Sequence, residues 1–418
     1  MKSTNNTNES KPTEQPPNKS NKINKENSFI DDTYKVLIDD LLGGGSFGHV
    51  YKCLNTKTNK EYSAKVESND NTSPQLFHEY KILKQLQGNE GIPTPYLFKN
   101  NGGESIMITD LLGPNLEDIL QYTKTKKFSL KTCLLTFKQI IERLKIIHKE
   151  GIIHRDLKPE NLLVTTNTRD GTIYLIDFGL SKKFIDPKTD LHIPFKCDRP
   201  ITGTIRYISI NTHKGYEQSR RDDIESACYI IVYFYCGELV WDGFKTKTKE
   251  EKIAKIMERK EEFKNSEEYL KLPQFFMPIF QYVYNMGFDE KPNYDYIIGV
   301  INKGLEQFEN QSNYEKTLLD WQSIEFMVEP IFKMIIEMKK KKLAEKIEKD
   351  KKEEEIKKKE EEAKKEEDKK NEEEKKREKF VENNNEKNTI NNKKYPNKGR
   401  NNNKAINHKM NKSLKKKK

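Results

Sequence analysis

The 418-residue chain has few cysteines and no long apolar run, and its N-terminal segment is polar. Its longest apolar run, Cys228–Cys236, reaches about half the length that a membrane-spanning helix needs. The five cysteines include no C-x-x-C pair, which favours reduced thiols over a disulfide framework. Residues 1–28 contain no apolar segment of the kind found in secretory signals. We therefore expect a soluble chain of the cytoplasm, the nucleus or both.

Charge is spread unevenly along the chain. Residues 339–418 hold 31 Lys/Arg and 18 Asp/Glu, so subtraction from the totals of 77 and 66 leaves 46 basic and 48 acidic residues before them. The net charge of +11 therefore belongs to the C-terminal tail. Apolar residues are only 33% of the chain, too few for every segment to bury a core.

Composition divides the chain into four segments. Residues 1–28 are predicted to be a disordered N-terminal tail, and residues 29–325 have the mixed composition of a folded domain. Residues 326–386 are predicted to form a helical, Lys/Glu-rich extension, and residues 387–418 a disordered basic tail. A solvated single helix is favoured over a coiled coil in the extension, because apolar residues are too sparse there for a heptad seam.

The folded part changes character along its length. Short β-rich segments at residues 34–42, 50–54 and 61–66 precede a helical pattern at 75–86, and helices dominate beyond residue 128. This order predicts an α+β fold with a small β-rich N-terminal lobe and a larger α-helical C-terminal lobe.

A glycine-rich segment between the first two predicted strands fits the pattern G-x-G-x-x-G-x-V. Its matching residues are Gly43, Gly45, Gly48 and Val50. Glycines allow backbone N–H groups to approach phosphate oxygens without obstruction by side chains. The segment is not a Walker loop, and glycine-rich hairpins also occur without a ligand, so this pattern alone leaves both interpretations open.

Lys65 lies inside an apolar predicted strand, where an unpaired ammonium group is costly to bury. Glu79, on the predicted helix that follows, is a suitable carboxylate partner. Such a pair would hold Lys65 against the α- and β-phosphates of a nucleotide. The alternative is a lysine on an edge strand with its head group in water.

The most specific motif is H-R-D-L-K-P-E-N at residues 154–161, which matches the catalytic loop of protein kinases. In this pattern Asp156 accepts the proton of the substrate hydroxyl, Lys158 neutralises the transferred phosphoryl group and Asn161 binds a metal ion. A D-F-G motif follows, in which Asp177 is expected to bind Mg²⁺ between the β- and γ-phosphates. These motifs, in this order, predict phosphoryl transfer from ATP.

Beyond the general kinase motifs, the chain resembles the casein kinase I family from about residue 34 to residue 321. The resemblance rests on L-L-G-P-N-L-E-D at 111–118, G-T-I-R-Y-I-S-I-N-T-H at 203–213, E-Q-S-R-R-D-D at 217–223 and F-D-E-K-P at 288–292. It implies a bilobal protein kinase fold and transfer of the γ-phosphate of ATP, with Mg²⁺, to Ser or Thr of protein substrates. The S-I-N-T-H run counts against tau-tubulin kinases, the nearest alternative.

The same resemblance implies a nucleotide pocket between the lobes. The hinge from Asp110 to Leu112 is expected to hydrogen-bond adenine, with Thr109 at the gatekeeper position and Asp223 holding the catalytic-loop backbone. Thr109 is smaller than the Met that relatives often carry, which implies a roomier pocket. Apolar side chains are expected on both faces of the adenine, namely Val50, Ala64, Leu163 and Ile176.

Basic residues in the matching segments imply a preference for acidic or already phosphorylated substrates. Arg206 and Lys245 match positions that family members use to bind an anion near the substrate groove, and Lys182 and Arg199 are candidates to join them. For each of these residues taken singly, a solvated surface charge is the favoured interpretation, and the anion site is favoured for them as a set. The resemblance also implies activity without phosphorylation of the activation-segment threonines, which are Thr189, Thr202 and Thr204.

The role of the basic tail stays open at this stage. Its composition suits contact with nucleic acid or an anionic membrane, and it equally suits a solubilising tail. A kinase-like scaffold without activity is the main rival for the folded part. The intact set of Lys65, Asp156, Asn161 and Asp177 argues against it. A monomer is expected.

Overall fold

The computed structural model describes the folded part of the chain and scattered helical positions beyond it. The described residues are 28–45, 48–69, 74–101, 103–167, 170–309 and 318–323, with single positions and short pieces between 333 and 364. The chain divides into two compact units, Met1–Ala344 and Glu345–Lys418. The tails predicted at 1–28 and 387–418 lie outside the described residues, apart from Ser28.

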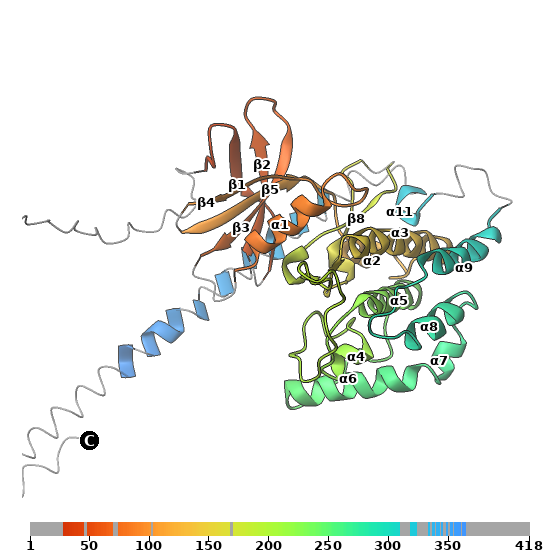
Figure 1. Ribbon diagram of the computed structural model, residues 1–418. Helices are drawn as coiled ribbons and strands as arrows, with labels where there is room; N and C mark the ends of the chain where they lie inside the picture. Colours follow the sequence, from red (N-terminus) through yellow and green to blue (C-terminus); the bar gives the residue numbers. More distant parts are fainter. Residues whose placement is uncertain are drawn as a thin grey trace, which may run out of the picture. The chain divides into compact units, whose positions relative to one another are not determined.

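The N-terminal lobe of the first unit is an antiparallel five-stranded sheet in the order β1-β2-β3-β5-β4 (Figure 1). Along β3 the side chains of Tyr62, Ala64 and Val66 are buried, which is the period-two pattern of a strand with one face on a core. The strands are β1 (Tyr34–Gly45), β2 (Gly48–Asn55), β3 (Glu61–Ser68), β4 (Pro95–Asn100) and β5 (Glu104–Asp110).

Helix α1 (Leu76–Leu86) packs against β4 and β5 through one apolar stripe. The buried residues recur at helical spacing and are Leu76, Glu79, Ile82, Leu83 and Leu86. Glu79 is the only charged member of this stripe among the described residues, so the helix pattern itself carries a carboxylate into the interior.

The C-terminal lobe is mostly helical, and α3 and α5 pack against each other at its centre. Ser129 caps α3 by accepting the N–H of Thr132, and Gly237 ends α5 with a φ of 81°. The helices are α2 (Leu116–Tyr122), α3 (Leu130–Lys149), α4 (Ile210–His213), α5 (Arg220–Cys236), α6 (Lys249–Phe263), α7 (Glu267–Leu270), α8 (Phe276–Tyr284), α9 (Tyr294–Glu306) and α11 (Asp320–Ser323).

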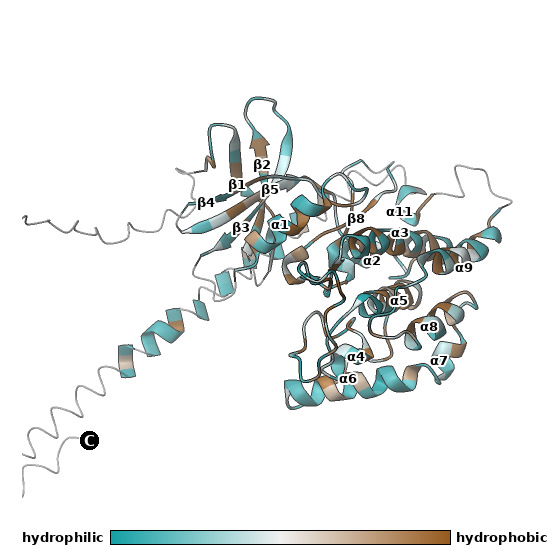
Figure 2. Cartoon of the chain, viewed as in Figure 1, coloured by the Kyte–Doolittle hydropathy of each residue, from teal (hydrophilic) through white to brown (hydrophobic). Residues whose placement is uncertain are grey.

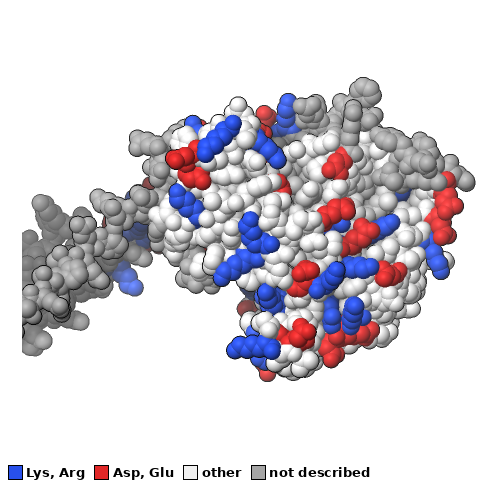
Figure 3. All heavy atoms as spheres, turned by 45° about the horizontal axis from the view of Figure 1, so that its top comes forward, with Lys and Arg blue, Asp and Glu red and all other residues white. Residues whose placement is uncertain are grey.

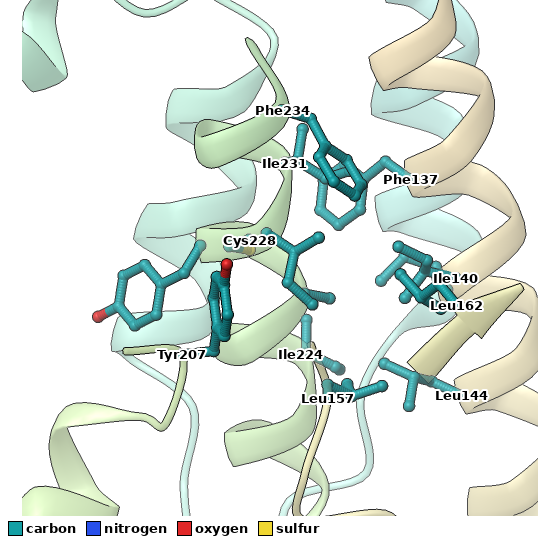
Figure 4. Close-up of a cluster of buried hydrophobic side chains, with 14 of the residues drawn as sticks. Phe137, Ile140, Leu144, Leu157, Leu162, Tyr207, Ile224, Cys228, Ile231 and Phe234 are labelled. Carbon is teal, nitrogen blue, oxygen red and sulfur yellow. The ribbon is translucent and has the colours of Figure 1, made fainter. Parts of the chain in front are cut away.

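The largest apolar core lies between α3 and α5 (Figure 4). Phe137 and Ile140 of α3 meet Ile231 and Phe234 of α5 there, and Cys228 is also a buried member of this core. By contrast, α6 is largely hydrophilic along its length (Figure 2). The α+β bilobal fold predicted from the sequence is confirmed.

Two short strand pairs hold the loops between the lobes in place. Strand β6 (Ile152–Ile153) pairs with β9 (Lys182–Lys183), and β7 (Leu162–Val164) pairs with β8 (Ile173–Leu175). Two 3₁₀ turns lie between these strands along the chain: η1 (Pro159–Asn161) comes between β6 and β7, and η2 (Phe178–Leu180) between β8 and β9. The catalytic loop and the D-F-G motif are therefore anchored to neighbouring backbone.

Charged side chains of both signs are mixed on the face of the molecule that Figure 3 shows. On the face drawn in Figure 3, Lys and Arg lie interspersed with Asp and Glu, in keeping with the near balance of charge before residue 339. Within the described part of the chain, no helix is long and apolar enough to cross a membrane.

Candidate active site

The glycine-rich hairpin is formed by the ends of β1 and β2, where Gly43 pairs with Val50 and Gly45 with Gly48. Gly48 has a φ of +142°, and a Cβ there would lie 2.1 Å from the carbonyl oxygen of Val66. The close approach of the β3 backbone therefore excludes a side chain at Gly48. Residues 46 and 47 lie outside the described part of the hairpin.

Lys65 of β3 is joined to two carboxylates from different parts of the chain. Its Nζ lies 2.7 Å from Oε2 of Glu79 on α1 and 3.0 Å from Oδ1 of Asp177 in the D-F-G motif. Burial by itself lowers the pKa of Lys65, but the two carboxylates outweigh it and raise that pKa above its ordinary value. This ion pair excludes the alternative of an edge-strand lysine in water.

The two carboxylates respond differently to burial. Burial raises the pKa of Glu79, whereas Lys65 outweighs burial at Asp177 and lowers the pKa of that group. Asp177 has a φ of 64°, in the left-handed region that costs a non-glycine residue energy. Asp177 is therefore kept ionised and in one backbone conformation, as a metal ligand requires.

The carboxylate of Asp156 accepts hydrogen bonds at both oxygens. Oδ2 accepts from Nζ of Lys158 over 2.7 Å, and Oδ1 accepts from the hydroxyl of Thr204 over 2.7 Å. The amide Nδ2 of Asn161 donates to the carbonyl oxygen of Asp156 over 2.9 Å. This leaves the amide oxygen of Asn161 for a metal ion.

A buried carboxylate on α5 positions the backbone of the catalytic loop. Asp223 accepts the N–H of His154 over 2.8 Å and that of Arg155 over 2.9 Å. It also lies 2.9 Å from Nε2 of His148 on α3. The role expected for Asp223 from the sequence agrees with these contacts.

The hinge begins at Asp110, the last residue of β5, and the side chain of Asp110 is bound by other residues of the small lobe. The Asp110 carboxylate accepts from the Thr94 N–H over 2.8 Å and from the Tyr96 hydroxyl over 2.7 Å, so only its backbone is suited to adenine. Behind it, the hydroxyls of Thr109 and Ser63 are 2.7 Å apart across β5 and β3. Ser63 was not expected at the pocket from the sequence, and it meets Thr109 because the strand register sets the two residues opposite each other.

The expected adenine walls come from both lobes. Val50 on β2 and Ala64 on β3 belong to the small lobe, and Ala64 is fully buried. Leu163 on β7 and Ile176, next to Asp177, belong to the large lobe and are half-buried. Leu163 also forms a bridge to Asn115, just beyond the hinge residue Leu112.

The four basic residues expected at an anion site fall into separate groups. Lys182 and Arg199 share the buried carboxylate of Glu217, at 2.7 and 3.2 Å. Arg206 instead pairs with Asp242, while Lys245 is exposed. Among the described side chains, no ion pair joins these groups. Neither acid was expected at this site from the sequence: Glu217 lies in the E-Q-S-R-R-D-D motif, and Asp242 lies outside the matching motifs.

The activation-segment threonines differ in their contacts. Thr189 is exposed, and the Thr202 hydroxyl donates to the carbonyl of Pro200. Thr204 is committed to Asp156, a contact that nothing in the local sequence pattern signals because the partners are far apart in the chain.

Comparison with known proteins agrees with this geometry. A family model described as "Protein kinase domain" matches residues 37–383. "Casein kinase I homolog 1" of Schizosaccharomyces pombe is 38% identical over 307 residues, which cover 72% of this chain and 68% of that protein. The chain belongs to the casein kinase I family of protein kinases. As a member of this family it is a Ser/Thr protein kinase.

Protein kinases use ATP with a divalent metal ion, and the residues present suit that use. Within the described residues, no group of three or more His, Cys, Asp or Glu side chains is arranged to hold a metal by itself. Asp177 and Asn161 offer two oxygen ligands, and Mg²⁺ commonly takes its remaining ligands from phosphates and water. The donor set therefore fits a metal that arrives with the nucleotide.

Proposed function

We propose that this casein kinase I family member transfers the γ-phosphate of Mg²⁺-bound ATP to Ser or Thr hydroxyls that lie near acidic or phosphorylated residues. The observation that carries the catalytic part is the contact of Lys65 with both Glu79 and Asp177. In kinases these groups must be assembled together before phosphoryl transfer. Their assembly also argues against the inactive scaffold.

Each residue of the site has one task in this proposal. Lys65 orients the α- and β-phosphates, Asp156 orients the attacking hydroxyl and accepts its proton, and Lys158 neutralises the transferred group. Asp177 and the Oδ1 of Asn161 hold Mg²⁺, which supplies charge neutralisation at the phosphates. Catalysis is then mostly positioning and electrostatic stabilisation.

The substrate preference in this proposal rests on the basic residues of the large lobe. Arg206 and Lys245 attract an anion beside the acceptor, and guanidinium and ammonium groups are the usual partners of phosphate. The enzyme acts as a monomer in the cytoplasm, the nucleus or both, where ATP and protein substrates occur. The tail's contact with nucleic acid or anionic membrane stays outside the proposal, because no described residue bears on it.

The test is radiolabelled phosphate transfer from ATP to casein and to paired peptides. One peptide carries phosphoserine three residues before the acceptor, and the other carries alanine there. Asp177→Asn is the matched variant, because it removes the metal-binding charge and keeps the shape. Labelling that favours the primed peptide and disappears in Asp177→Asn is expected. An absence of labelling with Mg²⁺ or Mn²⁺ from folded protein would reject the proposal.

A further inference from the structure

Arg206, the central residue of the proposed anion site, is already bound by a carboxylate of the same chain. Its Nε donates to Oδ1 of Asp242 over 2.8 Å, and its Nη2 donates to Oδ2. Such a two-point contact is the arrangement that a substrate phosphate would make with arginine. We propose that Asp242 is a specificity-determining residue that competes with the phosphate of a primed substrate for Arg206. This inference rests on the proposed function and deepens it.

The Asp242 carboxylate is held by its own turn, independently of Arg206. The N–H of Leu239 donates to Oδ2 over 2.9 Å, and the N–H of Asp242 donates to the carbonyl of Leu239 over 2.9 Å. The neighbouring Trp241 is buried, and its indole N–H donates to the carbonyl of Arg206 over 2.9 Å. The carboxylate is therefore fixed beside the guanidinium before any substrate arrives.

The remaining edges of the guanidinium are also engaged. Nη1 donates to the Tyr207 hydroxyl over 3.0 Å, and the group lies 4.1 Å from the centroid of the Tyr233 ring. The Nε–Nη2 edge is thus the one suited to a two-point contact with an anion, and Asp242 occupies it. A substrate phosphate must displace Asp242 or accept a poorer contact.

Exposure of the pair makes this competition possible. The Arg206 side chain is 32% exposed and that of Asp242 is 29% exposed, so an anion from solvent can reach them. The charges of Arg206 and Asp242 cancel, so the exposed Lys245 has no net positive charge from this pair to help it attract an anion. A phosphoserine carries nearly two charges and competes better than a single carboxylate. Asp242 therefore weakens the recognition of anionic substrates and penalises singly charged ones most.

The test uses peptides with alanine, aspartate or phosphoserine at the same position before the acceptor. Asp242→Asn keeps an acceptor oxygen for Arg206 and Leu239 but removes the charge. The ratio of kcat/KM for the phosphoserine peptide over the alanine peptide is expected to rise about tenfold in this variant. Asp295→Asn is the control, because it neutralises an exposed aspartate on α9 that pairs with Lys145 and not with Arg206. It should leave the ratio at the wild-type value.

A binding measurement separates this inference from the proposed function. Fluorescence anisotropy of a labelled phosphoserine peptide needs no phosphate transfer, and Asp242→Asn should lower its Kd about tenfold. The same substitution should have no effect in an Arg206→Gln background. Tighter binding without phosphate transfer would support Asp242's role and reject the proposed function. Phosphate transfer with an unchanged ratio and Kd would overturn the inference alone.

Two further results would also overturn it. One is an equal gain from Asp242→Asn when Arg206 is already Gln, since the charge would then act elsewhere. The other is an equal gain in Asp295→Asn, which would show a general charge effect. Thermal unfolding checks that each variant is folded, and Asp242→Ser replaces Asp242→Asn in every comparison if the asparagine variant is not.

Discussion

Thr204 donates its hydroxyl to Oδ1 of Asp156 over 2.7 Å, so the activation segment and the catalytic loop meet at one carboxylate. The other oxygen of Asp156 accepts from Lys158. A carboxylate that accepts hydrogen bonds at both oxygens is held in one orientation. The substrate hydroxyl that Asp156 must activate therefore has to approach a carboxylate whose position is already fixed. Thr204 is therefore a positioning residue for the proposed reaction.

Replacing Thr204 with Val removes this hydroxyl and keeps the branched shape. We expect kcat to fall by about 100-fold, because small misplacement of a catalytic group costs about that much, while KM for ATP changes little. Thr204→Ser keeps the hydroxyl and should stay within a few-fold of wild type. Steady-state kinetics with casein and varied ATP check this. A wild-type kcat in Thr204→Val would show that Asp156 does not depend on the contact.

Glu79→Gln breaks the buried pair that aligns Lys65. Lys65 keeps Asp177 as a partner, so the protein should fold, but the lysine loses the carboxylate that fixes it from α1. We expect kcat/KM for ATP to fall by about 100-fold. Glu90→Gln is the control, because Glu90 is 73% exposed and its ion-pair partner is Arg143 and not Lys65. Equal losses in the two variants would contradict the assignment.

Lys260→Met tests a fully buried lysine that holds the substrate-side loop. Its ammonium group donates to the carbonyls of Ile205 over 3.0 Å and Ile208 over 2.6 Å, on both sides of Arg206. Methionine fills the space but removes the ammonium donor from both carbonyls, which should lower the free energy of unfolding by about 3 kcal/mol. Urea titration followed by tryptophan fluorescence measures it. The exposed Lys271→Met should change stability by no more than about 0.5 kcal/mol.

The candidate catalytic and nucleotide residues could be named from the sequence because most of them lie in short motifs with a known chemistry. Asp156, Lys158 and Asn161 share one loop, and the D-F-G motif fixes Asp177 by its neighbours. Lys65 could be matched to Glu79 because an apolar strand and an amphipathic helix both turn these charges inward. The two lobes could be predicted because the apolar residues change along the chain from the spacing of strands to the spacing of helices.

The contacts that could not be predicted join residues far apart in the chain. Thr204 and Asp156 meet only when the activation segment is folded, and Arg206 meets Asp242 only through the turn after α5. Local patterns report burial and charge, but they do not say which acid a given arginine will find. For this reason four basic residues looked alike in sequence, although two of them share Glu217 and one is neutralised by Asp242.

His213 makes stability depend on pH in a defined window. Burial and, next to it, Lys260 lower the pKa of His213 to about 3 from 6.5. Between these values the His213 ring binds a proton in the unfolded chain but not in the folded one, so the contribution of this ring to stability falls as pH falls from about 6.5 towards 3. Lys260, whose pKa burial lowers to about 7 from 10.5, alters the pH dependence only above that value, so it adds no slope between pH 6.5 and 3.

His213→Gln removes the titrating ring and keeps an acceptor for the Lys260 ammonium. Wild type should lose about 3 kcal/mol more free energy of unfolding than this variant between pH 6 and pH 4, since each unit contributes about 1.4 kcal/mol per group. Urea titrations at pH 6, 5 and 4 provide the comparison. The buried His148, whose pKa is lowered by burial, titrates in both proteins and cancels in the difference. Parallel stability curves would mean that His213 is protonated in the folded state, which its fully buried lysine neighbour makes costly.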